Sequence, residues 1–141
     1  MSFEDFWEFA NKREASILSQ DKTFWVFEDA YKRAETMLRG LEPWCKEDTF
    51  EMLMYNLALH YIITFDFEVD GEQNPLYTKY KIKEKAEGIV NSASDESSSA
   101  SLQITDAMQQ LDYFGLDLTQ TPYGKFVYSL LCQINAMAVL L

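Results

Sequence analysis

The stretch TFEMLMYNLALHYIITFDF, from Thr49 to Phe67, decides the fold that this sequence predicts. Its apolar residues recur three and four positions apart, as they do along one face of a helix. That face consists of Phe50, Leu53, Met54, Leu57, Tyr61 and Phe65. The other side is apolar as well, through Tyr55, Ala58 and Ile62. Because a helix that is apolar on more than one side is usually buried, we expect it to be central in a bundle or shared with a neighbouring subunit.

Helical patterns recur along most of the chain, and together they predict a mainly α protein. The predicted helices span about 2–9, 21–39, 44–67, 76–87, 106–112 and 122–139. The apolar face of the second is expected to hold Phe24, Phe27, Tyr31, Ala34, Met37 and Leu38. Ser2 and Thr121 are suited to cap the first and last helices, and Pro122 suits a first helical turn. The pattern of 76–87 also permits a strand, and the polar stretch 68–74 predicts a loop.

The serine-rich segment 88–104 interrupts these helices. It is predicted to be either a disordered linker or a long β-hairpin that protrudes from a small helical bundle, before the last helices. Since an isolated two-stranded hairpin is marginal in water, an ordered hairpin here needs a partner. The residues expected to make that contact are Ile89, Val90, Ser92, Ser94, Ser99, Ser101 and Gln103.

The last predicted helix carries no charge between Phe126 and the final residue of the sequence. So apolar a segment needs burial, either against its own core or against another chain. The residues at helical spacing that we expect to form its contact face are Tyr123, Phe126, Leu130, Ile134, Met137 and Leu141.

The composition bounds the architecture and excludes some partners. A chain of 141 residues with 48% hydrophobic residues fits a single folded domain, 1–141. Its 12 basic and 23 acidic residues give a net charge of −11, which argues against a grip on nucleic acid or an anionic membrane. The longest apolar stretches are shorter than the roughly 20 residues of a membrane span. The two cysteines, Cys45 and Cys132, are expected to be buried free thiols, with a disulfide as the alternative.

No residue pattern in the sequence indicates catalysis, a metal or a cofactor. The single histidine, His60, has no neighbouring ligands or positioned nucleophile, which favours a core or interface position. The alternating carboxylates Asp66, Glu68, Asp70 and Glu72 suggest a calcium loop, but the remaining features of an EF-hand are missing. We therefore expect a protein that is not an enzyme and holds no cofactor.

Five short motifs follow one another along most of the chain. They are FWEF (Phe6–Phe9), NLALHYI (Asn56–Ile62), GIVNSAS (Gly88–Ser94), SASLQ (Ser99–Gln103) and TPYG (Thr121–Gly124). In this order they make the chain resemble the head–tail connector, or adaptor, proteins of tailed bacteriophages, with TPYG at a helix start as the most specific motif. The chain departs from that family at Asp95–Glu96, where the hairpin tip often has a glycine, and in its unusually apolar last helix.

The resemblance implies a structural protein of the virion neck, made in the cytoplasm of the bacterial host. It implies a dodecameric homo-oligomeric ring that binds the portal protein, extends the DNA channel and receives the next neck or tail-terminator protein. DNA is expected to pass through the ring without specific binding, and the negative charge agrees with this. The serine-rich hairpin is then expected to contact a neighbouring subunit, and the last helix the portal or a neighbour.

Two other kinds of function stay open at this point. An acidic interaction module, such as an inhibitor that mimics DNA or binds a basic partner, fits the net charge of −11. A small hydrolase with an unrecognised site is the third hypothesis.

Overall fold

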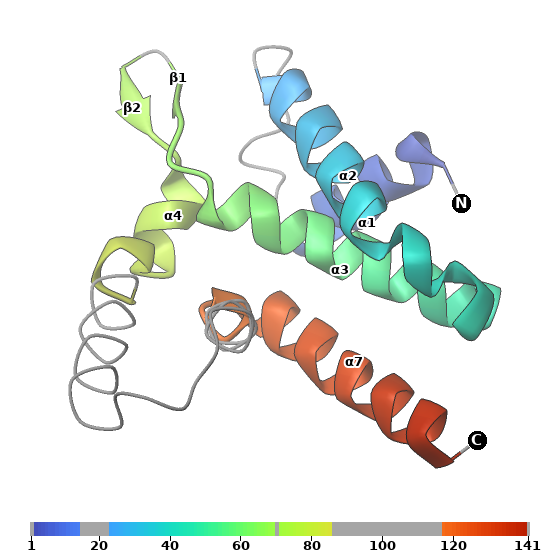
Figure 1. Ribbon diagram of the computed structural model, residues 1–141. Helices are drawn as coiled ribbons and strands as arrows, with labels where there is room; N and C mark the ends of the chain where they lie inside the picture. Colours follow the sequence, from blue (N-terminus) through green and yellow to red (C-terminus); the bar gives the residue numbers. More distant parts are fainter. Residues whose placement is uncertain (1, 15–22, 70, 86–116, 141) are drawn as a thin grey trace, which may run out of the picture.

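The computed structural model describes residues 2–14, 23–69, 71–85 and 117–140. In this part the chain is mainly helical, with one small β-hairpin (Figure 1). The elements are α1 (Phe3–Arg13), α2 (Phe24–Leu38), the 3-10 helix η3 (Arg39–Trp44), α3 (Glu47–Thr64), β1 (Glu68–Val69), β2 (Glu72–Gln73), α4 (Pro75–Lys79) and α7 (Pro122–Leu140). The predicted hairpin at 88–104 and the predicted helix at 106–112 lie outside the described residues.

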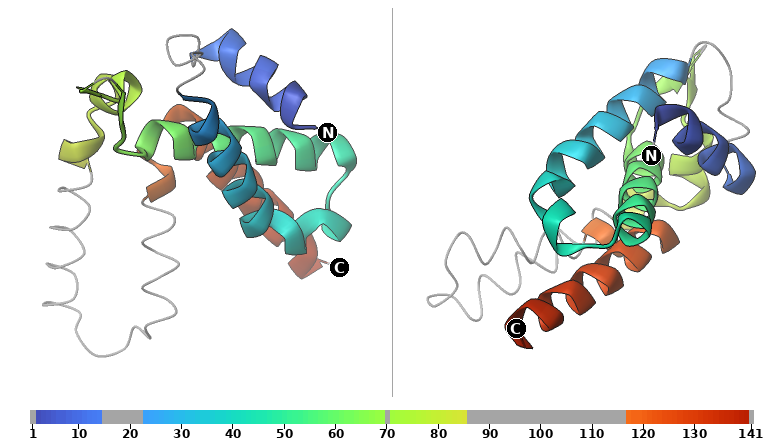
Figure 2. Two further views of the ribbon diagram at one scale, coloured as in Figure 1. Left: turned by 90° about the horizontal axis from the view of Figure 1, so that it is seen from above. Right: turned by 90° about the vertical axis from the view of Figure 1, so that its right-hand side faces the viewer.

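Helix α3 is the centre of the fold, as its sequence predicts. It contacts α1, α2, α4 and α7, and α7 packs on the opposite side of α3 from α1 (Figure 2). Its buried residues face in every direction around the helix. They are Phe50, Leu53, Met54, Tyr55, Asn56, Leu57, Ala58, Leu59, His60, Ile62 and Ile63. A helix with so little polar surface is stabilised mainly by the neighbours that cover it.

Helix α1 is held against this centre by aromatic side chains. Ser2 caps α1 by accepting a hydrogen bond from the Asp5 amide at 3.2 Å, as expected. The fully buried Phe6 packs its ring 5.6 Å from that of Tyr31 on α2 and 5.8 Å from that of Tyr55 on α3. Rings at these separations add to the stability that burial alone provides. The helix continues to Arg13, four residues beyond the predicted end.

Helix α2 buries a face that overlaps the predicted one only in part, because Phe27, Ala34 and Leu38 are shared. Its buried residues are Val26, Phe27, Ala30, Ala34 and Leu38. Two residues of the predicted face are instead exposed, Phe24 by 46% and Met37 by 54%. Val26 and Ala30, which lie outside the predicted face, are buried in their place.

Three further predictions of where elements lie are wrong. The predicted helix at 44–67 is shorter, because Pro43 lies in η3, Cys45 and Lys46 are extended, and the chain is extended again from Phe65. The stretch 68–74, predicted to be a loop, contains the antiparallel strands β1 and β2. The predicted helix at 76–87 is broken after α4, where Lys81 has a positive φ of 53° before a helical turn at 82–85.

Asn74 fixes the direction in which the chain leaves α3. Its buried side chain donates hydrogen bonds to the carbonyls of Ile62 (2.9 Å) and Phe65 (3.0 Å), and it accepts one from the Leu76 amide. It thereby satisfies carbonyls at the end of α3 and caps the start of α4 with one side chain.

Among the described helices, none is long and apolar enough to cross a membrane.

Candidate functional site

A buried polar junction joins α3 to the start of α7. His60 on α3 has no exposed surface. Its Nδ1 atom lies 2.7 Å from Thr121 Oγ1, and its Nε2 atom lies 3.1 Å from Asp117 Oδ2. A buried imidazole of this kind needs a partner for each nitrogen, and the junction supplies both.

The hydroxyl of Thr121 takes part in two hydrogen bonds of the junction. Its oxygen accepts the Gly124 amide proton at 2.9 Å, which caps α7 as the sequence predicts. Because the Asp117 carboxylate can only accept, the proton between it and His60 belongs to Nε2, and the tautomer with Nδ1 unprotonated accepts a hydrogen bond from the Thr121 hydroxyl. One threonine therefore both starts α7 and orients the histidine.

Gly124 lets α7 approach α3 more closely than any other residue would. A Cβ atom at this position would lie 2.1 Å from the Leu118 carbonyl oxygen and 2.8 Å from His60 Nδ1. Neither atom belongs to a flexible chain end, because one is backbone and the other is a ring atom held by hydrogen bonds. The TPYG motif thus has a physical role for Thr121 as the cap, Pro122 in the first turn and Gly124 at the contact.

The same junction connects the residues that precede the segment 86–116 to those that follow it. Lys85 Nζ donates to the carbonyl of Gln120 at 2.8 Å, and Gln120 Nε2 donates to Asp117 Oδ1 at 3.0 Å. The residues that precede and follow 86–116 are therefore held together beside His60.

The order hydroxyl, imidazole, carboxylate is also that of a catalytic triad. Thr121 is only 1% exposed, however, and its oxygen already accepts a helix amide. A nucleophile has to reach a substrate, so this arrangement suits a structural junction. The prediction that His60 is a buried histidine is confirmed. Within the described residues, no three His, Cys, Asp or Glu side chains gather where they could hold a metal ion.

The two cysteines differ from the prediction of a buried pair. Both are free thiols, but Cys45 is half-buried and Cys132 is exposed on α7. Cys132 is exposed because the core-facing side of α7 passes through Leu131 and not through the next residue.

The face predicted for the last helix is divided between the protein core and the surface. Tyr123, Leu130 and Ile134 pack against the core on either side of the fully buried Val127, whereas Phe126 is 38% exposed. Their core contact explains part of the apolar character of α7 without another chain. Some of the predicted contact residues lie outside the described part. They are the hairpin set from Ile89 to Gln103, Leu141 and the side chain of Met137.

A groove between α2 and α3 is the feature that sequence reasoning missed. It has a volume of about 420 Å³ and is lined by Lys32, Arg33, Thr36, Met37 and Tyr61. Its only sequence signal was Met37, which the helical pattern assigned to the core. Burial, with Asp117 as a nearby charge, raises the pKa of Tyr61 to about 12, so its hydroxyl is neutral at ordinary pH.

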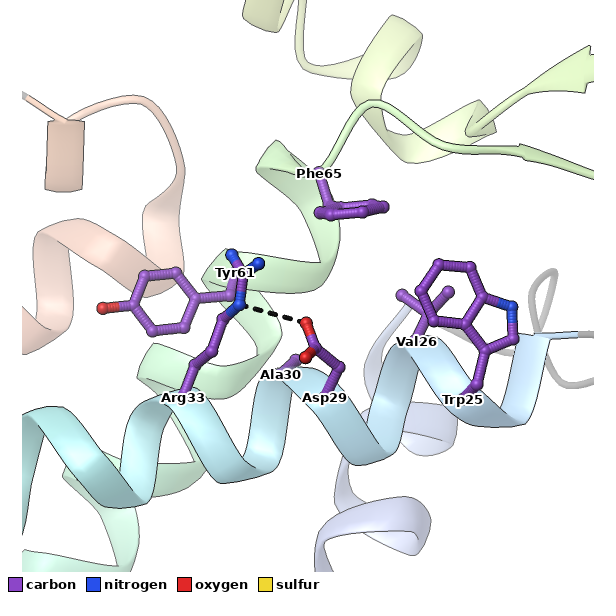
Figure 3. Close-up of a pocket in the computed structure, with 7 residues that line it drawn as sticks. All are labelled: Trp25, Val26, Asp29, Ala30, Arg33, Tyr61 and Phe65. Carbon is purple, nitrogen blue, oxygen red and sulfur yellow. Dashed lines mark ion pairs between the residues drawn. The ribbon is translucent and has the colours of Figure 1, made fainter.

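A narrower pocket continues from this groove towards the β-hairpin and shares Arg33 and Tyr61 with it (Figure 3). Trp25 and Phe65 stand beside it, with ring centroids 5.9 Å apart. The Arg33 guanidinium lies 5.7 Å from the Phe65 ring and pairs with Asp29 at 3.0 Å. Aromatic side chains and the Asp29–Arg33 ion pair therefore follow one another along the side of α2 that faces Tyr61 and Phe65.

Comparison with known proteins assigns no family to this chain. No model of a known protein family matches the chain, and no solved structure matches it. An uncharacterized protein of Methanocaldococcus jannaschii is 33% identical over 70 residues, which are 50% of this chain. The matched stretch is 12% of that protein, so the chain corresponds to a small part of it.

Proposed function

We propose that this protein is a structural component of a tailed-bacteriophage virion. As an adaptor, it forms a ring between the portal protein and the next neck or tail-terminator protein, and the ring extends the channel through which DNA passes. The proposal starts from the order of five sequence motifs and gains weight from the structural roles of two of them.

One observation carries the proposal furthest. His60 of the NLALHYI motif and Thr121 of the TPYG motif are 61 residues apart in sequence, yet their side chains meet in the junction. Gly124, the last residue of TPYG, packs against the same histidine. Two of the five motifs are therefore adjacent in space and have structural roles in this chain, and this is the structural support for the proposal.

The charge distribution suits a conduit for DNA. The chain carries a net charge of −11. Of the described cations, Lys32 pairs with Glu28, Arg33 with Asp29 and Lys79 with Glu14. A lumen lined by such a surface repels phosphate, so DNA slides through without being held.

Co-expression with the portal protein of the same phage tests the proposal. We expect a complex that purifies as one species and shows an additional ring below the portal in electron micrographs, absent from portal alone. A strict monomer that does not bind the portal contradicts the proposal.

The exposed part of α7 gives this test a matched pair of variants. Phe126 belongs to the predicted contact face, and Tyr128, about 200° further around the helix, is also exposed. We expect Phe126→Ser to weaken portal binding about tenfold, and Tyr128→Ser to leave it unchanged. Equal effects of the two variants would exclude the predicted face as the portal contact.

The net charge of −11 also favours a second candidate function, an acidic module that binds a basic partner. Such a module works as a monomer and binds a basic protein, for example a nuclease, in competition with DNA. Binding of this kind by a chain that ignores the portal would select this function over the adaptor.

A further inference from the structure

The groove between α2 and α3 has the chemistry of a receptor for an acidic side chain next to an apolar one. Of the five residues that line it, Lys32 and Arg33 are cations and none is acidic. Met37 and Tyr61 supply apolar surface, and Met37 is 54% exposed. In a chain with 23 acidic and 12 basic residues, a surface of this composition stands out.

The cations of the groove are available to a partner. Lys32 pairs with Glu28 at 3.1 Å and Arg33 with Asp29 at 3.0 Å, each within one helical turn. Both pairs are largely exposed to solvent, and such pairs contribute little to stability. A carboxylate from another chain can therefore share or replace them at small cost.

The complementary surface lies on this same protein. Six large hydrophobic side chains are exposed in the described part: Phe24, Trp25, Met37, Met52, Phe126 and Tyr128. Met52 has acidic neighbours on α3, since exposed Asp48 lies one turn before it and Glu51 directly precedes it. We call Asp48, Glu51 and Met52 the acidic knob.

Asp48 and Met52 of the knob lie on the other side of α3 from Tyr61, the groove residue that α3 contributes. Met52 and Tyr61 are nine positions apart, which is about two and a half helical turns and half a rotation. Two different surfaces on opposite sides cannot contact each other within one chain. They can do so between successive copies, which is the heterologous contact from which rings are built.

We propose that the acidic knob of one copy docks into the α2–α3 groove of the next. Met52 packs against Met37 and Tyr61, and Asp48 pairs with Lys32 and Arg33. This inference rests on the ring of the proposed function and names the surfaces through which its subunits meet.

Charge reversal with rescue tests the pairing on the purified full-length chain. We expect Lys32→Glu and Asp48→Lys each to weaken self-association about tenfold in sedimentation velocity. The variant that carries both substitutions recovers most of the association, because each reversed charge again meets its opposite. Lys83→Glu, an exposed reversal outside both surfaces, is the matched control and leaves association unchanged.

A crosslinking experiment tests the same pairing without relying on charge. Cys45 and Cys132 are first replaced by serine, and Met37→Cys and Met52→Cys are then introduced into separate chains of different mass. Oxidation of the mixture is expected to give the heterodimer, whereas each chain alone stays largely monomeric. Equal dimer formation by the single chains would overturn the inference.

Two outcomes separate this inference from the function on which it rests. If the portal recruits the chain into a ring that both charge reversals leave intact, the pairing is wrong and the adaptor function stands. If the reversals and their rescue behave as expected but the chain ignores the portal, the pairing stands and the adaptor function is wrong.

Discussion

Gly124→Ala is the sharpest test of the junction between α3 and α7. The added methyl group would lie 2.1 Å from the Leu118 carbonyl oxygen and 2.8 Å from His60 Nδ1. Carbon atoms do not approach oxygen or nitrogen so closely, so the start of α7 has to move away from the Leu118 backbone and from the His60 ring of α3. That movement lengthens the 2.7 Å contact between His60 Nδ1 and Thr121 Oγ1.

The expected size of the effect follows from three contributions. Overpacking of a close contact costs about 1–3 kcal/mol. A buried histidine nitrogen that loses its partner costs about 1–3 kcal/mol more. Alanine is about 1 kcal/mol better than glycine inside a helix, which offsets part of this loss. We therefore expect Gly124→Ala to lower the free energy of unfolding by about 3 kcal/mol, a large share of the 5–15 kcal/mol typical of a domain.

Urea denaturation followed by circular dichroism measures this difference. Gly40→Ala is the matched control, because a Cβ at Gly40 meets nothing within 4 Å. We expect the control to change the free energy of unfolding by less than about 1 kcal/mol. If Gly124→Ala is as stable as Gly40→Ala, the close approach of α7 to α3 is not a feature of the folded protein and the reasoning fails.

Three further predictions concern other contacts of the fold. Thr121→Val should cost about 2–4 kcal/mol in urea denaturation, because it removes the cap of α7 and the donor to His60, whereas Thr121→Ser should cost less than about 1 kcal/mol. Because burial raises the pKa of Tyr61 to about 12 in the folded state, stability should fall as the pH rises from about 10, the ordinary tyrosine value, to about 12. Base-unfolding curves of Tyr61→Phe should lack that part of the decline. Glu14→Gln should speed hydrogen exchange in α1, because Glu14 at its end accepts hydrogen bonds from Lys79 and Tyr80, and unchanged exchange would contradict a role in docking α1.

The central helix could be predicted because its signal is local and redundant. Thr49 to Phe67 contains enough apolar residues that no choice of face leaves the helix exposed. Its position in the bundle therefore did not depend on which neighbours cover it. Helix α2 shows the opposite case, because Phe24 and Met37 fit a helical face but are exposed. Which side of α2 turns inward depends on how α2 packs against α3, which is a property of two helices and not of one.

The role of His60 could not be predicted from its neighbours in sequence. Its partners, Asp117 and Thr121, are 57 and 61 residues away, and only the fold brings them to the two ring nitrogens. The histidine alone suggested burial and nothing about what burial accomplishes.

Gly124 nevertheless carries a signal that sequence reasoning can use. It lies in the first turns of a helix whose start is already set by Thr121 and Pro122, and glycine costs about 1 kcal/mol relative to alanine inside a helix. A glycine inside a helix therefore indicates a place where the helix backbone comes close to another group of the protein. The structure identifies this neighbour as the Leu118 carbonyl and the His60 ring. A glycine that conflicts with local propensity inside a well-capped helix therefore predicts a tight contact, although it cannot name the partner.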